Sequence, residues 1–217
     1  GTSLHELTLN ADAAMYYAKE RGRNGYYCFD SAMNANAHQQ FLLQQALRHA
    51  LEREELVLHY QPKYDARSGR VVGAEALLRW QHPEYGTISP ARFLPLAEKT
   101  RLIIPIGNWV LDEACRQMSR WRDAGHPDWS VAVNLPTIQL ASPGLLEEVE
   151  TALSRHRLGA RHLTLEITEA TAMENAEESL AILNRLAKLG LGISIDDFGT
   201  GYSSLLYLKR FPANELK

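Results

Sequence analysis

Cysteine and long apolar runs are both scarce in this sequence. Its two cysteines, Cys28 and Cys115, lie far apart and without CxxC spacing, which argues against a zinc site and against a disulfide framework. No apolar run approaches the roughly 20 residues of a membrane-spanning helix, and the first residues lack the pattern of a signal peptide. We therefore expect a cytoplasmic chain without direct membrane contact, with Cys115 in its core.

An excess of charge of either sign is also missing. The net charge of -3 and the pI near 6.3 provide no basic surface of the kind that gathers nucleic acid. A polymeric nucleic-acid partner is therefore not expected. With 217 residues, of which 45% are apolar, the chain can bury one sizeable core.

The first 30 residues are too few to form a core of their own. Their pattern predicts a helix that ends near Arg21, a turn at Gly22 and Gly25, and a short aromatic strand over residues 26–29. We interpret residues 1–30 as the remnant of an upstream domain.

A second helix is expected to begin at Ser31. Apolar residues recur along one face of it at helical spacing: Leu43, Leu47, Ala50 and Leu51. We place a linker and the start of this helix at residues 31–40, and the main domain at residues 41–217.

The rest of the sequence alternates between short apolar stretches and amphipathic stretches. The expected strands are LVLHYQPKY, VVGAEALLRW, SVAVNL, HLTLEITE and LGISIDDFG, and a sixth begins at the final ELK. This alternation predicts an α/β fold with a mostly parallel sheet, either doubly wound or closed into a barrel. Because the sequence stops as a strand begins, we expect the natural protein to be longer, or the chain to be a fragment.

Side-chain parity along four strands brings four polar residues to one face of the sheet. These residues alternate with the apolar residues of their strands and occur late in them: Glu75, Asn134, Glu166 and Asp196. In barrels of strands and helices, catalytic groups lie at these strand ends. A single acid there is more often a solvated loop residue or a helix N-cap, so the prediction depends on the agreement of all four.

Clustered carboxylates of this kind repel one another and need compensating cations. Oxygen ligands, without cysteine or a well-placed histidine, favour magnesium or manganese over zinc. The sequence therefore predicts a site for hard divalent cations.

The motif EALLRW, which begins at Glu75, is the signature of the EAL domains. The motifs YQPKYD, QHPEYGTISPARFLPLAEKTRLI, VNLPTIQL, LTLEITE and DDFGTGYSSLLYLKRFP surround it in the order typical of that family. Residues 37–217 thus resemble the EAL-type cyclic di-GMP phosphodiesterases of bacteria. The resemblance implies a (βα)8 TIM-like barrel whose first strand runs antiparallel to the others, incomplete here, with about five strands and the start of the sixth.

The resemblance also implies roles for individual residues. The positions that match the family's ligands for two Mg²⁺ or Mn²⁺ ions are Glu75, Asn134, Glu166, Asp196 and Asp197. Lys217 matches the lysine that hydrogen-bonds the attacking water. Lys217, Glu75, Asp196 and Asp197 together make up the implied catalytic set.

Three further residues are candidates outside the metal site, two of them by resemblance and Gln61 by its place on its strand. Arg79 matches an arginine that contacts a substrate phosphate, with a surface ion pair as the alternative. Gln61 lies on the polar face of its strand, where it either lines the substrate site or has a packing or hydrogen-bonding role. Glu169 matches a glutamate that steadies the FGTGYSSL loop, and is otherwise a solvated strand-end residue. The loop lacks the GK[ST] of a P-loop.

The first 30 residues resemble the end of a GGDEF domain, chiefly through NADAAMYYAKERGRN. The GGDEF signature itself is absent, so no cyclase activity is assigned. The family resemblance implies hydrolysis of cyclic di-GMP to linear pGpG by a homodimer that assembles through the EAL domain. The alternatives are a sensor that binds cyclic di-GMP without cleaving it and a dimerisation module, because a catalytic glutamate and later strands of the family do not occur in this sequence.

Overall fold

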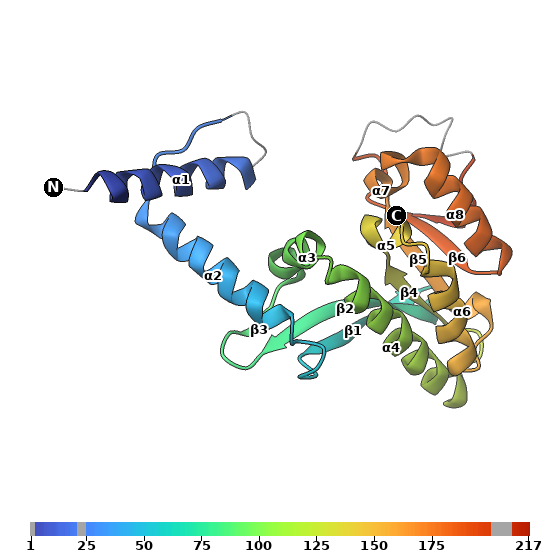
Figure 1. Cartoon of the computed structure of the whole chain (residues 1–217). Helices are drawn as coiled ribbons and strands as arrows, with labels where there is room; N and C mark the ends of the chain where they lie inside the picture. The colour runs from blue at the N-terminus through green and yellow to red at the C-terminus, as the bar shows by residue number, and fades with distance from the viewer. Residues whose placement is uncertain (1–2, 21–24, 201–209) are drawn as a thin grey trace. The chain divides into compact units, whose positions relative to one another are not determined.

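The computed structural model describes residues 3–20, 25–200 and 210–217, and the chain forms two compact units, Gly1–Arg53 and Glu54–Lys217. The N-terminal unit contains two helices, α1 (Leu4–Glu20) and α2 (Ser31–Leu47), which contact each other (Figure 1). Both helices were predicted from the sequence. The domain limits predicted at residues 30 and 40 stay a prediction.

Residues 25–30, between these helices, contain no strand, so the aromatic strand predicted over residues 26–29 is wrong. A strand is stable only when a neighbouring strand pairs with its N–H and C=O groups, and the described residues of this unit contain no other strand. Gly22, where a turn was expected, lies outside the described residues.

The apolar positions predicted near α2 are largely buried. Leu43, Leu47 and Ala50 are buried and Leu51 is half-buried. Helix α2 ends at Leu47, so Ala50 and Leu51 belong to the turns that follow it.

The C-terminal unit is built on a seven-stranded sheet. Its strands are β1 (Leu56–Tyr64), β2 (Val71–His82), β3 (Gly86–Ile88), β4 (Ser130–Asn134), β5 (Leu163–Thr168), β6 (Gly192–Asp196) and β7 (Glu215–Leu216). The strand order is β1-β2-β4-β5-β6-β7, with β3 paired to β2. β1 runs antiparallel to β2, and all pairs from β2–β4 to β6–β7 are parallel. The expected antiparallel first strand is therefore confirmed.

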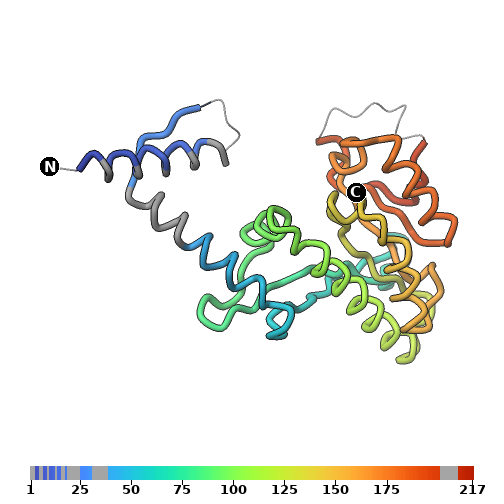
Figure 2. Tube along the Cα trace, viewed as in Figure 1, coloured from blue at the N-terminus to red at the C-terminus, as the bar shows by residue number. Residues whose placement is uncertain are grey.

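Helices connect the parallel strands from β2 to β6, as the trace in Figure 2 shows. They are α3 (Pro90–Lys99), α4 (Ile103–Asp123), α5 (Thr137–Leu140), α6 (Leu145–Arg155), α7 (Glu169–Glu174) and α8 (Ala176–Lys188), with a short 3-10 helix, η1 (Ala160–His162). α4 contacts β1 and β4, and α8 contacts β6, so helices cover one face of the sheet. This mixed α/β fold is consistent with an incomplete TIM-like barrel.

The covered face is made by the apolar residues of each strand. Leu163, Leu165 and Ile167 on β5 are almost fully buried, as are Ile193 and Ile195 on β6. Because side chains alternate along a strand, the residues between them face the interior of the curved sheet. The helices thus leave that inner face available for polar groups.

The close approach of β2 and β4 depends on Gly73. A Cβ atom at this position would lie 2.1 Å from the backbone oxygen of Ser130 on the neighbouring strand. Any side chain here would push the two strands apart, and Glu75 lies only two positions further along β2.

Strand β3 was not predicted. It forms a hairpin with the end of β2, where Ile88 lies opposite Trp80. Trp80 is fully buried and donates its indole N–H to Oε2 of Glu55 at 2.9 Å. Within the part of the chain that the structure describes, none of the helices combines the length and the apolarity of a membrane span.

Candidate active site

The four polar residues selected by strand parity lie on neighbouring strands, on the inner face of the sheet. Asn134 and Asp196 end their strands, whereas Glu75 lies well within β2 (Val71–His82), so the expectation that it occurs late in its strand is wrong. In the strand register, Asn134 lies opposite Glu166, and Asp196 lies opposite Thr168, the last residue of β5. Glu75 lies opposite Ala132, two residues before Asn134. The fold therefore brings together side chains that are far apart in the sequence.

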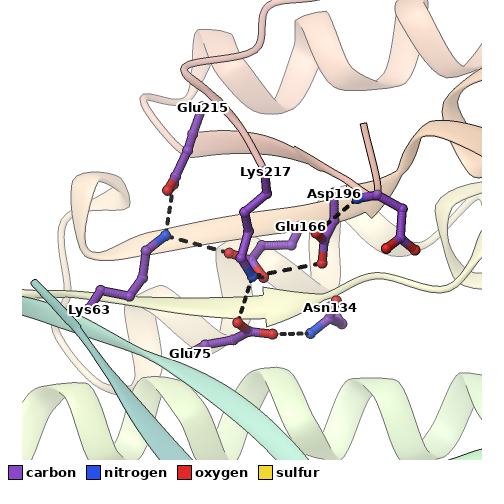
Figure 3. Close-up of polar contacts among 8 residues, drawn as sticks. Lys63, Glu75, Asn134, Glu166, Asp196, Glu215 and Lys217 are labelled. Carbon is purple, nitrogen blue, oxygen red and sulfur yellow. Dashed lines mark hydrogen bonds and ion pairs between the residues drawn. The ribbon is translucent and has the colours of Figure 1, made fainter. Parts of the chain in front are cut away.

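Three of these side chains surround the ammonium group of Lys217 (Figure 3). Its Nζ lies 2.6 Å from Oε2 of Glu75, 3.0 Å from Oε2 of Glu166 and 3.7 Å from Oδ2 of Asp196. We call Glu75, Glu166 and Asp196 the carboxylate cluster. In this structure a lysine ammonium lies where the sequence predicts hard divalent cations.

Asn134 is joined to the carboxylate cluster through Glu75. Its side-chain amide donates a hydrogen bond to Oε1 of Glu75 at 2.9 Å, while Oε2 of the same carboxylate accepts from Lys217. Both oxygens of Glu75 are therefore held, and the side chain has a fixed direction.

The two glutamates of the cluster have opposite pKa shifts. Burial raises the pKa of Glu166, and the negative charge of Glu75 adds to this effect. Burial also acts on Glu75, but hydrogen bonds from Lys217 and Asn134 outweigh it and lower the pKa of Glu75. Burial by itself would lower the pKa of Lys217, and its bonds to the two glutamates raise it instead.

A second lysine, Lys63 of β1, also reaches this interior. Its Nζ lies 2.7 Å from Oε2 of Glu215 and 3.5 Å from Oε1 of Glu166. Our sequence reasoning missed both Lys63 and Glu215. Parity could have found them, because Lys63 lies two residues after Gln61 on β1 and Glu215 two residues before Lys217.

Asp197, directly after β6, has an unusual backbone conformation. Its φ of 55° lies in the left-handed region, which aspartate tolerates better than most residues. Its backbone N–H donates to Oδ1 of Asp196 at 2.9 Å, and its own side chain is exposed. The structure thus places Asp197 beside the cluster, with its carboxylate outside the bonds to Lys217 described above.

The loop after Asp197 is held at two points. The N–H of Gly199 donates to Oε2 of the buried Glu169 at 2.6 Å, and the N–H of Phe198 donates to the backbone oxygen of Lys217 at 2.9 Å. Glu169 is therefore not the solvated residue that was its alternative reading. Residues 201–209, which include the rest of the FGTGYSSL motif, lie outside the described residues.

Arg79 and Gln61 lie on the two strands that pair beside Glu75. Arg79 is half-buried and donates from Nη1 to the backbone oxygen of Leu78 at 2.8 Å. Gln61 is exposed and lies opposite Glu75 in the β1–β2 register. Among the described residues, no hydrogen bond or ion pair joins either side chain to the cluster, so their predicted roles towards substrate stay predictions.

The donor set of the cluster fits a hard cation. Glu75, Glu166, Asp196 and Asn134 offer oxygen atoms. Oε1 of Glu166 is buried and accepts no hydrogen bond within the described part of the chain, where its ionic contact is Lys63 at 3.5 Å. With Lys217 between the carboxylates, however, no three His, Cys, Asp or Glu side chains among residues 3–20, 25–200 and 210–217 are arranged to hold a metal ion.

A comparison with known families agrees with this architecture. The EAL domain model matches residues 44–217, most of the chain. The chain belongs to the EAL domain family.

The chain is also similar to individual proteins of known name. It is 63% identical, over its whole length, to the bifunctional diguanylate cyclase/cyclic di-GMP phosphodiesterase MucR of Pseudomonas aeruginosa. It is 41% identical, again over its whole length, to the cyclic di-GMP phosphodiesterase PdeR of Escherichia coli. The chain spans 32% of the length of each of these curated relatives.

A solved structure has a similar fold. The PaMucR phosphodiesterase in complex with c-di-GMP matches with a TM-score of 0.79 and 63% sequence identity, and the match covers 81% of this chain and 71% of that one. The resemblance to the EAL family that the sequence motifs indicated is therefore confirmed. The resemblance of the first 30 residues to a GGDEF domain stays a prediction.

Proposed function

We propose that this chain is the EAL part of a metal-dependent phosphodiesterase that hydrolyses cyclic di-GMP to linear pGpG. One observation carries the proposal: Glu75, Glu166 and Asp196 converge from three strands on a single position that holds a positive charge. The relatives named as cyclic di-GMP phosphodiesterases support this choice of substrate.

Two divalent cations, Mg²⁺ or Mn²⁺, fit the proposed chemistry. The residues that would hold them are Glu75, Asn134, Glu166, Asp196 and Asp197. When bound, the ions would neutralise charge on the scissile phosphate and activate the attacking water. Oε2 of Glu166, which lies 3.0 Å from Nζ of Lys217 at the centre of the cluster, supports a ligand role for this side chain.

Lys217 and Arg79 would act on the water and the phosphate. Because Lys217 neutralises the carboxylates in this structure, its ammonium group is free for another task only once cations replace it. It would then hydrogen-bond the attacking water, while the planar guanidinium of Arg79 would orient a phosphate.

The test is product analysis with the full-length protein. We expect linear pGpG to form from cyclic di-GMP with Mg²⁺ or Mn²⁺, to stop on addition of EDTA, and to return when excess Mg²⁺ is added back. Equal turnover with and without EDTA would sink the metal-dependent mechanism. Tight binding of cyclic di-GMP without any hydrolysis would favour the sensor instead.

Assembly into a homodimer through the EAL domain stays a prediction. Glu169 and the loop after Asp197, which the family resemblance links to dimer contacts, are joined by the bond between Glu169 and Gly199. Light scattering of the full-length protein tests this prediction, because a mass of one subunit at working concentrations would contradict it.

A further inference from the structure

Lys63 contacts the carboxylate oxygen of Glu166 that is not bonded to Lys217. The two oxygens of the Glu166 carboxylate are divided between two ammonium groups, with Oε2 at 3.0 Å from Lys217 and Oε1 at 3.5 Å from Lys63 (Figure 3). A carboxylate held from both sides cannot turn freely about its last bond. The side chain of Glu166 has an exposed fraction of 0%, so water does not compete for these contacts.

Lys63 is in turn held by Glu215. The bond between Lys63 Nζ and Glu215 Oε2, at 2.7 Å, joins β1 to β7, two strands whose bonded residues are 152 positions apart in the chain. The side chain of Lys63 has an exposed fraction of only 25%, unlike an ordinary surface lysine. Glu215 therefore directs the ammonium group, and the ammonium group meets Glu166.

The pairing of β1 with β2 is irregular directly after Lys63. Lys63 pairs with Gly73 and Tyr64 pairs with Val71, so the extra, unpaired residue is Val72 on β2. Such a bulge ends the regular pairing of the two strands next to the site. The contact that directs the ammonium group of Lys63 is therefore its bond to Glu215.

We propose that Lys63 is a positioning residue that, held by Glu215, fixes which oxygen of Glu166 faces the proposed metal site. This inference rests on the proposed function. When divalent cations replace the ammonium group of Lys217, Lys63 still holds Oε1, and Oε2 is kept pointing to the centre of the carboxylate cluster. Lys63 contacts a proposed ligand and has no assigned contact with substrate.

The experiment uses a charge-balanced double variant of the full-length protein. Lys63→Met with Glu215→Gln removes one positive and one negative charge, so the net charge near the site is unchanged and only the hold on Glu166 is lost. The matched control, Lys188→Met with Glu150→Gln, makes the same two substitutions at exposed helical positions. The measurements are Mn²⁺ affinity of the substrate-free protein by calorimetry, and kcat and KM for cyclic di-GMP.

Loss of an outer partner of a metal ligand typically lowers metal affinity or activity about 10- to 100-fold. We therefore expect the double variant to bind Mn²⁺ about tenfold more weakly and to lose about tenfold in kcat, with KM within about twofold of wild type. The control pair should behave as wild type. The single variant Lys63→Arg keeps a cation in reach of both Glu166 and Glu215. It should therefore retain most of the wild-type Mn²⁺ affinity.

Several results would overturn the inference. Wild-type Mn²⁺ affinity in the double variant would do so, even if the melting temperature fell, because the pair would then only stabilise the fold. A raised KM with unchanged kcat and Mn²⁺ affinity would show that Lys63 binds substrate instead. If the double variant does not fold, the variant Glu215→Asp replaces it. This substitution keeps every charge, but the shorter side chain weakens the bond to Lys63. Wild-type Mn²⁺ affinity in the Glu215→Asp protein would contradict the inference.

Failure of the proposed function has a different signature. A wild-type protein that binds Mn²⁺ but does not hydrolyse cyclic di-GMP would sink the phosphodiesterase, while the Mn²⁺ titration would still test Lys63. A wild-type protein that binds no Mn²⁺ would overturn both.

Discussion

In the middle of strands β5 and β6, residues on the two faces are equally buried but have opposite chemistry. Leu165 and Ile195, on the helix-covered face, have exposed fractions of 0%, and Glu166 and Ser194, on the inner face, have 1% and 0%. Burial favours folding on the first face, because it removes apolar surface from water. On the second face it costs free energy, because Glu166 Oε1 and Ser194 Oγ lack hydrogen bonds among the described residues.

The difference shows that burial alone does not mark a residue as part of the core. Along one strand, the residues at every second position stabilise the fold by packing in the core. The residues between them assemble a charged site, and burying that site lowers the stability of the fold. Substitutions on the two faces should therefore have separate consequences: unfolding on one, loss of chemistry on the other.

The largest effect is expected from truncation on the apolar face. Ile193→Ala removes a fully buried side chain and should lower the free energy of unfolding by about 2–5 kcal/mol, with activity per folded molecule largely kept. Urea titration of the full-length protein measures this free energy, with proteolytic cleavage within residues 54–217 as the signal for unfolding. Val72→Ala, at an exposed position of β2, is the control and should change stability by less than about 0.5 kcal/mol. Equal effects at both positions would contradict the comparison.

Glu75→Gln changes the inner face while keeping its shape. We expect turnover of cyclic di-GMP to fall about 100-fold or more, because a proposed ligand loses its charge, while the fold survives. The metal-free protein should become slightly less stable. Its ionised Glu75 has a lowered pKa and is bonded to Lys217, so the charge contributes to stability at neutral pH.

Hydrolysis rates and melting curves of the Glu75→Gln protein test this pair of effects. Glu150→Gln, at an exposed position of α6, serves as control and should leave both unchanged. A Glu75→Gln protein that hydrolyses normally would refute the ligand assignment, and one that unfolds at low temperature would identify Glu75 as structural.

Arg79→Lys should have a smaller effect, confined to substrate. A lysine ammonium is a point charge and cannot reproduce the planar fork of a guanidinium, so kcat/KM should fall about tenfold while Mn²⁺ affinity stays unchanged. Steady-state kinetics together with Mn²⁺ calorimetry measure the two quantities. Unchanged kinetics would reduce Arg79 to a structural residue that bonds the backbone oxygen of Leu78.

The smallest effect concerns Cys115, on the helix that covers the apolar face. Burial raises the pKa of the Cys115 thiol to about 12, and the charge of Asp112 adds to this. Only the thiolate reacts, so iodoacetamide at about pH 8 should modify the exposed Cys28 and spare Cys115 until the protein unfolds. Peptide mass spectrometry shows which thiol is labelled. Equal labelling of both in the folded protein would mean that α4 opens readily.

Much of this arrangement was predictable from the sequence, because strand parity is a local property. Glu166 and Asp196 alternate with apolar neighbours, so their shared face followed from the pattern, and the register then places them beside each other. The predicted strands also agree closely with β1, β2, β4, β5 and β6.

One missed element, the three-residue strand β3, pairs locally with the end of β2. The other errors arose where a feature depends on distant partners. The expected strand over residues 26–29 has aromatic residues but lacks a neighbour to pair with among the described residues of its unit. The position of Lys217 within the carboxylate cluster, and the bond between Lys63 and Glu215, require β1 and β7 to face one interior. No local pattern contains that information, although parity assigns each residue to a face.

Lys217 belongs to two networks at once. Its ammonium group lies among the carboxylates, and its backbone oxygen accepts the N–H of Phe198, in the loop that Glu169 also holds. Thermodynamic linkage between such sites is reciprocal. If cations displace the ammonium group and the strand end shifts, the conformational equilibrium of the loop shifts as well. A partner that binds the loop must then change the affinity for cations by the same factor as the cations change the affinity for that partner. The strand end at Lys217 would then transmit free energy between the interior and the surface.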